Sequence, residues 1–281
     1  MKPLLCLAVG AALMVLDMSN SVGVSESGQT LPGCLAPPAL LAIEPALTHV
    51  ASRIEKGERL TIVAIGSSST QGVGASAPTL SYPSRLEAEL RQRLPQIDIR
   101  VINRGKGGED APEELARLER DVIAERPDLV VWQIGTNAVL RREDQSSDGE
   151  ALRHGVALLR QSASDVILMD MQYAPRVVAR PAYSAMQRLI AEVAERSHVG
   201  LFRRFDIMRH WQSEQPQAAA APAIGSDGLH MTDRGYACLA AGLAEAITRN
   251  WRDYEREARG ARAARFASIV DAADLAGGDS F

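Results

Sequence analysis

Short apolar runs alternate with longer amphipathic segments through the middle of this 281-residue chain. The apolar runs cover residues 60–66, 97–103, 128–135, 165–171 and 200–205. Between them, segments such as 82–94, 111–125 and 183–196 carry apolar residues at helical spacing. An alternation of strands and helices predicts a mainly parallel sheet that is covered by helices on both faces.

The size and charge of the chain limit its domain number and its partners. At 281 residues and 46% hydrophobic composition, the chain can bury one sizeable core, which we place at residues 45–256. The net charge is −4 and the arginines are scattered, so the sequence lacks the basic surface that nucleic-acid binding requires. Nucleic acid is therefore not an expected partner.

The two ends of the chain differ in composition from its centre. Lys2 precedes an apolar run at residues 4–16, which is typical of a secretory signal, and we predict a signal peptide at residues 1–24. The run is shorter than the ~20 residues of a membrane span, so we expect export to the periplasm or the medium, with a retained signal anchor as the alternative. Residues 25–44 are predicted to be a linker, and residues 257–281 a mobile tail.

Three cysteines allow two interpretations. Removal of a signal peptide would leave Cys34 and Cys238, which can pair in an exported protein. We favour a free, buried thiol at Cys238, because the surrounding segment is an apolar helix. A lipid anchor at Cys34 is a further alternative. The sequence has no metal-ligand spacing, so no metal or other cofactor is expected.

Polar residues follow several of the predicted strands. They form the segments 67–70, 103–114 and 135–137, and a further polar segment at 226–232 precedes the last helix, which is expected to run from Thr232 to about Tyr254. Ligands of open α/β sheets bind beyond the carboxyl ends of the strands. We therefore expect these four segments to converge at one edge of the sheet.

Each segment contains residues that can take part in catalysis or ligand binding. Asp227 and His230 are three residues apart in a loop, as an orienting carboxylate and a general base can be. Asn137 can donate a hydrogen bond to an oxyanion, and Gly108 lets a backbone N–H approach a ligand closely. Taken singly, each residue can equally serve a turn or a helix cap, as Asp110 and Glu113 do in a predicted capping box.

The order of the four segments resembles the sequence blocks of the SGNH hydrolases, also called GDSL esterases and lipases. The resemblance covers residues 60–247 and implies a flavodoxin-like three-layer α/β/α sandwich with a central five-stranded sheet. It also implies a serine esterase in which Ser68 is the nucleophile, His230 the base and Asp227 its orienting partner. The implied oxyanion hole consists of the N–H groups of Ser68 and Gly108 and the side-chain amide of Asn137.

One departure from the family pattern concerns the first block. The family usually has Asp where this chain has Ser67, which leaves Ser67 and Ser69 as neighbours that compete with Ser68 for the role of nucleophile. A literal Gly-Asp-Ser stands at residues 278–280, but no strand precedes it and no helix follows it. It therefore lacks the supported turn that a nucleophile needs.

Two other functions remain open at this point. The hydroxyl-rich segment 67–70 is also typical of the phosphate loops of flavodoxin-like binding proteins. A non-catalytic carbohydrate-binding protein of the same fold is the second alternative. For an esterase, the resemblance allows small-molecule, glycan or lipid esters as substrates, and the sequence does not distinguish among them.

Overall fold

A five-stranded parallel sheet forms the centre of the protein. The computed structural model describes residues 34, 36–141, 145–214 and 222–276. The strands are β1 (Leu60–Gly66), β2 (Ile99–Gly105), β3 (Leu129–Gln133), β4 (Asp165–Met169) and β5 (Gly200–Phe202), in the order β2-β1-β3-β4-β5. All four strand pairs are parallel. The predicted flavodoxin-like sheet is thus confirmed.

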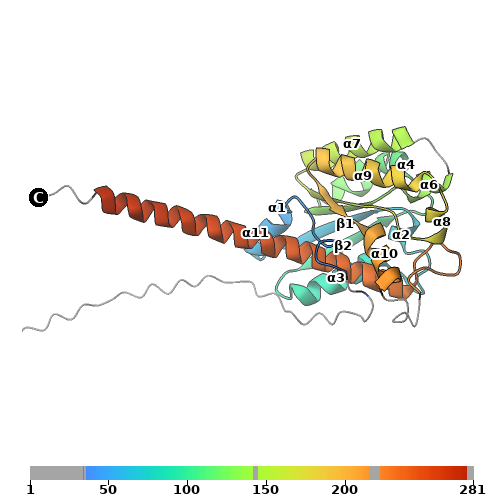
Figure 1. Ribbon diagram of the computed structural model, residues 1–281, viewed down its shortest axis with the longest axis horizontal. Coiled ribbons are helices and arrows are strands. Elements are labelled where there is room, and N and C mark those ends of the chain that lie inside the picture. The colour runs from blue at the N-terminus through green and yellow to red at the C-terminus, as the bar shows by residue number, and fades with distance from the viewer. Residues whose placement is uncertain (1–33, 35, 142–144, 215–221, 277–281) are drawn as a thin grey trace, which may run out of the picture.

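Helices cover both faces of this sheet (Figure 1). They are α1 (Thr48–Lys56), α2 (Ser68–Gln71), α3 (Tyr82–Arg93), α4 (Ala111–Leu115), α5 (Leu118–Asp121), α6 (Thr136–Arg141), α7 (Gln145–Gln161), α8 (Pro175–Val178), α9 (Tyr183–Arg196), α10 (Arg204–Glu214) and α11 (Asp233–Ala276), with 3-10 turns η1 (Pro78–Leu80) and η2 (Ile123–Glu125). One apolar cluster packs α1, α3 and α11 against the sheet, and another packs α4 to α7 and α9 against the opposite face.

The strands β1, β3 and β4 are largely apolar because both faces of the sheet are covered there, whereas the edge strand β2 carries the exposed Arg100 and Asn103. Along β1, Ile62 and Ala64 belong to the first cluster, whereas Val63 and Ile65 belong to the second. Successive side chains of a strand point to opposite faces, so a strand that is covered twice needs a continuous apolar run. Gln133, at the end of β3, is a polar exception that is fully buried.

The segment 111–125, which the sequence predicts as one helix, is broken into α4, α5 and η2. The break falls at Arg117, which precedes α5 and whose side chain is 7% exposed. The guanidinium points inward to Glu109, so Arg117 does not lie on the solvent face that a continuous amphipathic helix would give it. Amphipathic spacing alone did not reveal this inward arginine.

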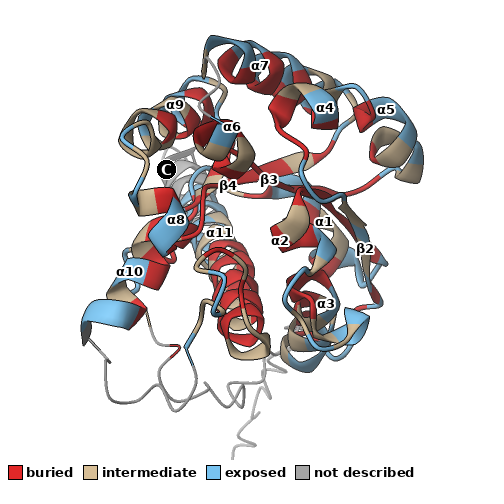
Figure 2. Ribbon diagram, turned by 90° about the vertical axis from the view of Figure 1, so that its right-hand side faces the viewer, coloured by how far each residue is buried: buried red, intermediate tan, exposed pale blue. Residues whose placement is uncertain are grey.

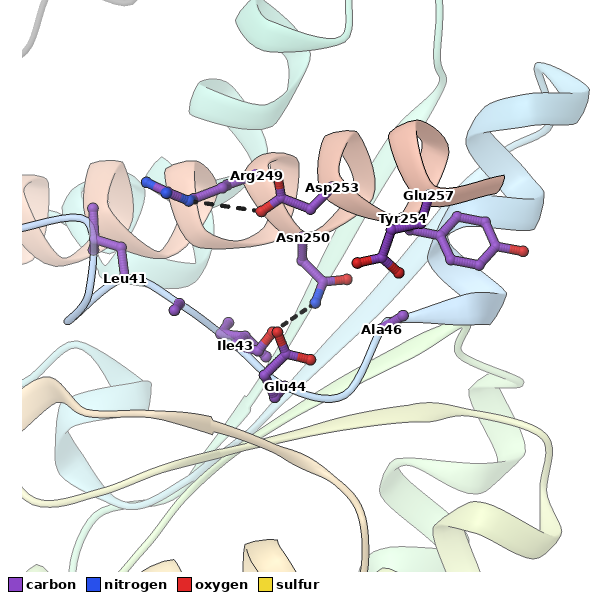
Figure 3. A pocket seen from close by; sticks show the side chains of 10 residues that line it. Leu41, Ile43, Glu44, Ala46, Arg249, Asn250, Asp253, Tyr254 and Glu257 are labelled. Atoms are coloured by element: carbon purple, nitrogen blue, oxygen red, sulfur yellow. Dashed lines mark hydrogen bonds and ion pairs between the residues drawn. The ribbon is translucent and has the colours of Figure 1, made fainter. Parts of the chain in front are cut away.

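A strap of residues 36–47 (the N-terminal strap) packs against α11, although the sequence suggested a linker up to residue 44. Leu41 and Ile43 are buried in the first apolar cluster. Asn250 of α11 donates from Nδ2 to the carbonyl of Ile43 (Figure 3). Its Oδ1 accepts the N–H of Leu47. The strap therefore belongs to the folded core, since both its apolar side chains and its backbone are bonded to α11.

Cys34 and Cys238 form a disulfide that joins this strap to α11. The prediction of a free thiol at Cys238 is therefore wrong, and Cys34 is not available for a lipid. The two cysteines are 204 residues apart in the sequence, with a Cα–Cα distance of 4.9 Å. The packing of the strap on α11 explains the pairing, because it brings the start of the strap beside a buried turn of the helix.

Helix α11 continues far beyond the expected end near Tyr254 and leaves the domain as a projecting rod (Figure 1). Up to Arg265, Trp251 is the last buried residue of α11, and the side chains from Arg259 to Arg265 are exposed. The segment is rich in Ala and Arg, which have high helix propensity, so the helix can continue without tertiary support. The tail proposed to begin at residue 257 is therefore helical up to Ala276.

Two earlier expectations fall on residues that the structure does not describe. The signal peptide at residues 1–24 and the literal Gly-Asp-Ser at residues 278–280 lie outside the described ranges. Within those ranges, no helix is both long and apolar enough to cross a bilayer. The same ranges contain no group of three His, Cys, Asp or Glu side chains that could bind a metal ion.

Candidate active site

The four polar segments converge at the carboxyl edge of the sheet, as the sequence predicted. This edge carries α2, α6 and α8 and faces the viewer in Figure 2. Residues 66–72 (the serine turn) leave β1, and residues 224–231 (the histidine loop) precede α11. Gly74, two residues after the serine turn, packs directly against the histidine loop, because a Cβ atom at this position would clash with the carbonyl oxygen of Met231.

Ser68, His230 and Asp227 form a continuous series of hydrogen bonds. The Oγ of Ser68 lies 3.1 Å from Nε2 of His230. The Nδ1 of the same ring lies 2.5 Å from Oδ2 of Asp227. An imidazole that is held between a hydroxyl and a carboxylate can accept the hydroxyl proton while the carboxylate stabilises the resulting imidazolium. Among the three adjacent serines, Ser68 is the one that contacts His230.

The histidine loop is shaped by its own backbone and by Asp227. Gly225 N–H donates to the carbonyl of His230 at 2.8 Å, and Oδ1 of Asp227 accepts the N–H groups of Leu229 and His230. Burial acts to raise the pKa of Asp227, but these N–H groups and the ring of His230 outweigh it and lower the pKa to about 2. Asp227 is therefore ionised at neutral pH.

The serine turn directs its other hydroxyls into the protein. Ser67 and Thr70 are buried, and each of their hydroxyls donates to Oε1 of Gln133. Ser69 is also buried, at 1% exposure. This arrangement disfavours the phosphate-loop alternative, because hydroxyls that are used inside the core are not available to a bound phosphate.

The segment around Gly108 lies next to the serine turn. Gly107 donates its N–H to Oε1 of Gln71 at 2.8 Å, and a Cβ atom on Gly107 would lie 3.9 Å from Cβ of Ser68. Gly108 has a φ of +86°, which favours glycine at this position. Arg141 donates to the carbonyl oxygen of Gly108 and so holds the peptide in place. The predicted capping box of α4 is confirmed directly after this segment.

Asn137 lies at the start of α6, beside the same segment. Its Nδ2 donates to the carbonyl oxygen of Glu109 at 2.7 Å. An amide nitrogen carries two hydrogens, so one remains for a further acceptor. Gly135, with a φ of +92°, makes the turn between β3 and α6 that brings Asn137 to this edge. Gly108 and Asn137 are therefore close to each other, as the sequence blocks predicted.

A buried ion pair that the sequence did not reveal supports these segments. Arg117 donates from Nε to Glu109 at 2.6 Å, and both side chains are 7% exposed. The guanidinium also contacts the carbonyl oxygen of Gly66, the first residue of the serine turn, at 3.4 Å. One arginine thus joins the serine turn to the residue that holds Asn137. Glu109 and Arg117 are eight positions apart in the sequence, and this spacing matches no motif that would predict an ion pair.

A second buried polar cluster lies beneath the histidine loop. Arg204 is fully buried and donates to the carbonyl of Asp170 and to Oε1 of Gln172, each at 2.9 Å. Gln172 in turn accepts from Thr136 and donates to the carbonyl of Leu229. Burial raises the pKa of Asp170 to about 7. The cluster links the ends of β3 and β4 to the histidine loop through atoms that are shielded from solvent.

Comparison with known proteins gives one family and a set of esterases with a similar fold. Over 98 residues the chain is 35% identical to an acetylxylan esterase of Geobacillus stearothermophilus, and this match covers 33% of the chain and 45% of that enzyme. A two-domain esterase active on acetylated mannans has a similar structure (TM-score 0.61, 21% identity, covering 78% of this chain and 58% of that one).

The crystal structure of Axe2, an acetylxylan esterase from the same Geobacillus species, is similar over 68% of this chain and 95% of its own, with a TM-score of 0.56 and 23% identity. At these identities, the structural matches establish the fold alone. The model of the Non-GDSL lipase-like family matches residues 33–253, which include the strap, the sheet and every segment of the candidate site. The chain belongs to the Non-GDSL lipase-like family.

Proposed function

We propose that this protein is a serine esterase of the SGNH type that removes acetyl groups from a polysaccharide. The observation that carries the proposal is the series of hydrogen bonds from Asp227 through His230 to Ser68. The series supports covalent catalysis, because it combines a hydroxyl, a base and a carboxylate in the order that acyl transfer requires.

In the proposed reaction, Oγ of Ser68 attacks the ester carbonyl while Nε2 of His230 takes the hydroxyl proton. The tetrahedral intermediate collapses, the ester C–O bond breaks, and His230 returns the proton to the leaving alcohol. A water molecule then attacks the acyl-enzyme, with His230 again taking a proton, and the carboxylic acid leaves as Ser68 regains its hydrogen. Asp227 stabilises the imidazolium that forms in both halves of the reaction.

Three donors are assigned to the developing oxyanion. They are the N–H groups of Ser68 and Gly108 and the remaining Nδ2 hydrogen of Asn137, whose other hydrogen is bonded to Glu109. The described chain gives neither backbone N–H an internal acceptor. A donor of this kind typically contributes about 3 kcal/mol to a transition state, which is on the order of a hundredfold in rate.

The substrate class rests on the relatives. Their names describe esterases of acetylated xylan and acetylated mannan, and both are acetylated polysaccharides. The chain spans 45% of the curated relative and 58% of the two-domain esterase, so the acetyl-polysaccharide substrate is a proposal for this chain. The disulfide supports export, since such bonds persist in oxidising compartments.

A serine-reactive probe tests the nucleophile. We expect a fluorophosphonate to label Ser68 in the purified protein, and Ser68→Ala to abolish both labelling and hydrolysis of acetylated xylan and mannan oligosaccharides. Ser69→Ala is the matched control, because Ser69 is adjacent but buried and should leave both signals intact.

Three outcomes would contradict parts of this proposal. A labelled peptide that maps to Ser67 or Ser69 would move the nucleophile. Preference for p-nitrophenyl palmitate over acetyl esters would replace the polysaccharide with a lipid substrate. Inertness toward the probe and toward every ester would favour the carbohydrate-binding alternative.

A further inference from the structure

Gln133 is a buried polar residue that the proposed reaction does not use. It is the last residue of β3, its side chain has no solvent exposure, and it lies directly beneath the serine turn. A polar side chain in a strand that is covered on both faces is costly unless its groups are bonded. Its hydrogen bonds therefore indicate what the residue contributes.

A single atom of Gln133 receives three donors from the serine turn. Its Oε1 accepts the N–H of Ser67 at 3.1 Å, the hydroxyl of Ser67 at 3.1 Å and the hydroxyl of Thr70 at 3.3 Å. The orientation of the amide follows from these partners, because a backbone N–H can only donate and must face the oxygen. In the part of the chain that is described, Nε2 of Gln133 is buried without a partner.

The serine turn is packed closely against β3 around these bonds. A Cβ atom on Gly66 would lie 2.4 Å from Oγ1 of Thr70 and 2.9 Å from Cβ of Gln133, so the turn rests directly on β3. Thr70 is also bonded to the hydroxyl of Tyr82 at 3.2 Å. Gln133 and its neighbours thus clamp the residues on either side of Ser68.

We propose that Gln133 is a positioning residue for Ser68, and that Ser67 and Gln133 form a matched donor–acceptor pair. The proposal rests on the proposed esterase function. Oε1 of Gln133 fixes the residue before Ser68 through its backbone and its hydroxyl, and so keeps Oγ of Ser68 within reach of His230.

The pair also accounts for the serine at position 67, where the resemblance to SGNH hydrolases leads one to expect aspartate. A carboxylate at this position would place a second acceptor against Oε1 of Gln133. The amide could turn its Nε2 toward the carboxylate, but the N–H of Ser67 would then lose its acceptor. Serine therefore supplies the donors that Oε1 of Gln133 accepts, and Ser67→Asp should lower activity although it restores the common family residue.

Two substitutions of Gln133 test the positioning role. Gln133→Met has a similar length but no acceptor, whereas the carboxyl group of Gln133→Glu retains an acceptor oxygen. Displacement of a reacting group by about 1 Å can cost on the order of a hundredfold in rate. We expect Gln133→Met to lower kcat by at least about tenfold with little change in KM. Gln133→Glu should retain more of the rate than Gln133→Met.

The rate of labelling separates positioning from a purely structural role. The fluorophosphonate reaction gives a rate constant per site and an amplitude that counts folded sites. Positioning predicts a lower rate constant in Gln133→Met at unchanged amplitude. Thr248→Val is the control, because Thr248 is a fully buried hydroxyl whose bonds lie within α11, and its rate constant should equal that of the parent.

Several results would overturn the proposal. A reduced amplitude with a parental rate constant would show that Gln133 serves only folding. If Gln133→Met does not fold, Ser67→Ala and Ser67→Asp decide instead, and parental or higher activity in Ser67→Asp would overturn the pairing. If the parent protein is neither labelled nor active on any ester, or if Ser68→Ala hydrolyses esters normally, the proposal of a Ser68 esterase itself fails and the role of Gln133 fails with it.

Discussion

Ser68 and His230 belong to two parts of the molecule that are held in place differently. The serine turn is bonded to buried partners on neighbouring strands and loops, including Gln133 and Arg117. The histidine loop is a surface turn, with side-chain exposures of 22% for His230 and 45% for Asp227. The hydrogen bonds that shape the histidine loop are mostly made within the loop, whereas those of the serine turn are made to other parts of the fold.

Because of this difference, substitutions in the two regions should affect activity and stability to different degrees. Substitutions in the exposed region should change the reaction while leaving folding almost intact, because solvent can replace the lost bonds there. Substitutions in the buried region should affect both, since unpaired buried groups are costly.

Asp227→Asn should remove nearly all activity and little stability. Asparagine keeps an oxygen for the N–H groups of Leu229 and His230, but its amide N–H₂ would face Nδ1 of the ring and favour the tautomer with hydrogen on Nε2. That tautomer cannot accept the proton of Ser68. In a comparable triad, this change lowers kcat by about 10⁴-fold, and we expect a decrease of similar order with an unchanged melting temperature.

Asp233→Asn is the matched control for Asp227→Asn. Asp233 is an exposed carboxylate that also accepts a backbone N–H, from Ser76, and it makes no contact with His230 among the described interactions. Its substitution should leave kcat unchanged. Unimpaired turnover in Asp227→Asn would reduce the mechanism to Ser68 and His230.

Asn137→Ala should reduce kcat by about a hundredfold while KM changes little, because the assigned hydrogen bond forms only in the transition state. Asn137 is partly buried, and its bond to the carbonyl of Glu109 links two segments of the buried region. A modest loss of stability should therefore accompany the loss of rate. Steady-state kinetics and urea unfolding measure the two effects. A kcat within a factor of about two of the parent would exclude Asn137 from the oxyanion hole.

Parts of this arrangement could be predicted from the sequence, and others could not. Ser68 and Asn137 follow predicted parallel strands, and Asp227 and His230 precede the last predicted helix, so their convergence at the carboxyl edge of the sheet could be expected. Their roles were implied by the resemblance to the SGNH hydrolases. Arg117 could not be placed, because its inward direction depends on a break in a segment that looks like one amphipathic helix. Gln133 left only a weak signal, as one polar residue in an apolar strand.

The N-terminal strap and the disulfide are a second feature that could not be predicted from the sequence. Residues 36–47 contain several prolines and no regular period, so the sequence suggested a linker, yet Leu41 and Ile43 pack in the core. The pairing of Cys34 with Cys238 depends on that packing. Local patterns therefore predicted the sheet and its helices, whereas irregular segments that are ordered by distant contacts escaped prediction.

A contrast between a buried and an exposed group also appears in the titration of two carboxylates, Asp170 beneath the histidine loop and Asp227 within it. Burial raises the pKa of Asp170 from 3.8 to about 7, whereas that of Asp227 is lowered to about 2. The native state therefore binds more protons than the unfolded state at Asp170 between pH 3.8 and about 7, and the free energy of unfolding should fall as the pH rises through this interval. Asp227 titrates below this interval and adds no slope within it.

Asp170→Asn should remove this part of the pH dependence. The amide oxygen can still accept the N–H of Phe205, as Oδ1 of Asp170 does at 2.9 Å, but the side chain no longer ionises. Urea unfolding at the two ends of the interval should show a smaller loss of stability in the variant than in the parent. An equal loss in both proteins would assign the pH dependence to other groups, of which the partly buried Asp165, with a pKa raised by burial to about 6, is the first to test.

The smallest effect is expected from truncation of the projecting part of α11. A chain that ends at Gly260 keeps Asn250, which bonds the N-terminal strap, and the buried Trp251. A Cβ atom on Gly260 would meet nothing within 4 Å, so the removed segment begins where the helix has left the domain. The truncated protein lacks Ser280 and its literal Gly-Asp-Ser, yet it should retain its esterase activity, its labelling at Ser68 and its melting temperature. A second truncation after Ile247 provides the contrast, because it removes Asn250 and Trp251 and should lower the melting temperature. A folded but inactive chain ending at Gly260 would mean that residues beyond the domain contribute to the site, and the assignment of Ser68 would then have to be reconsidered.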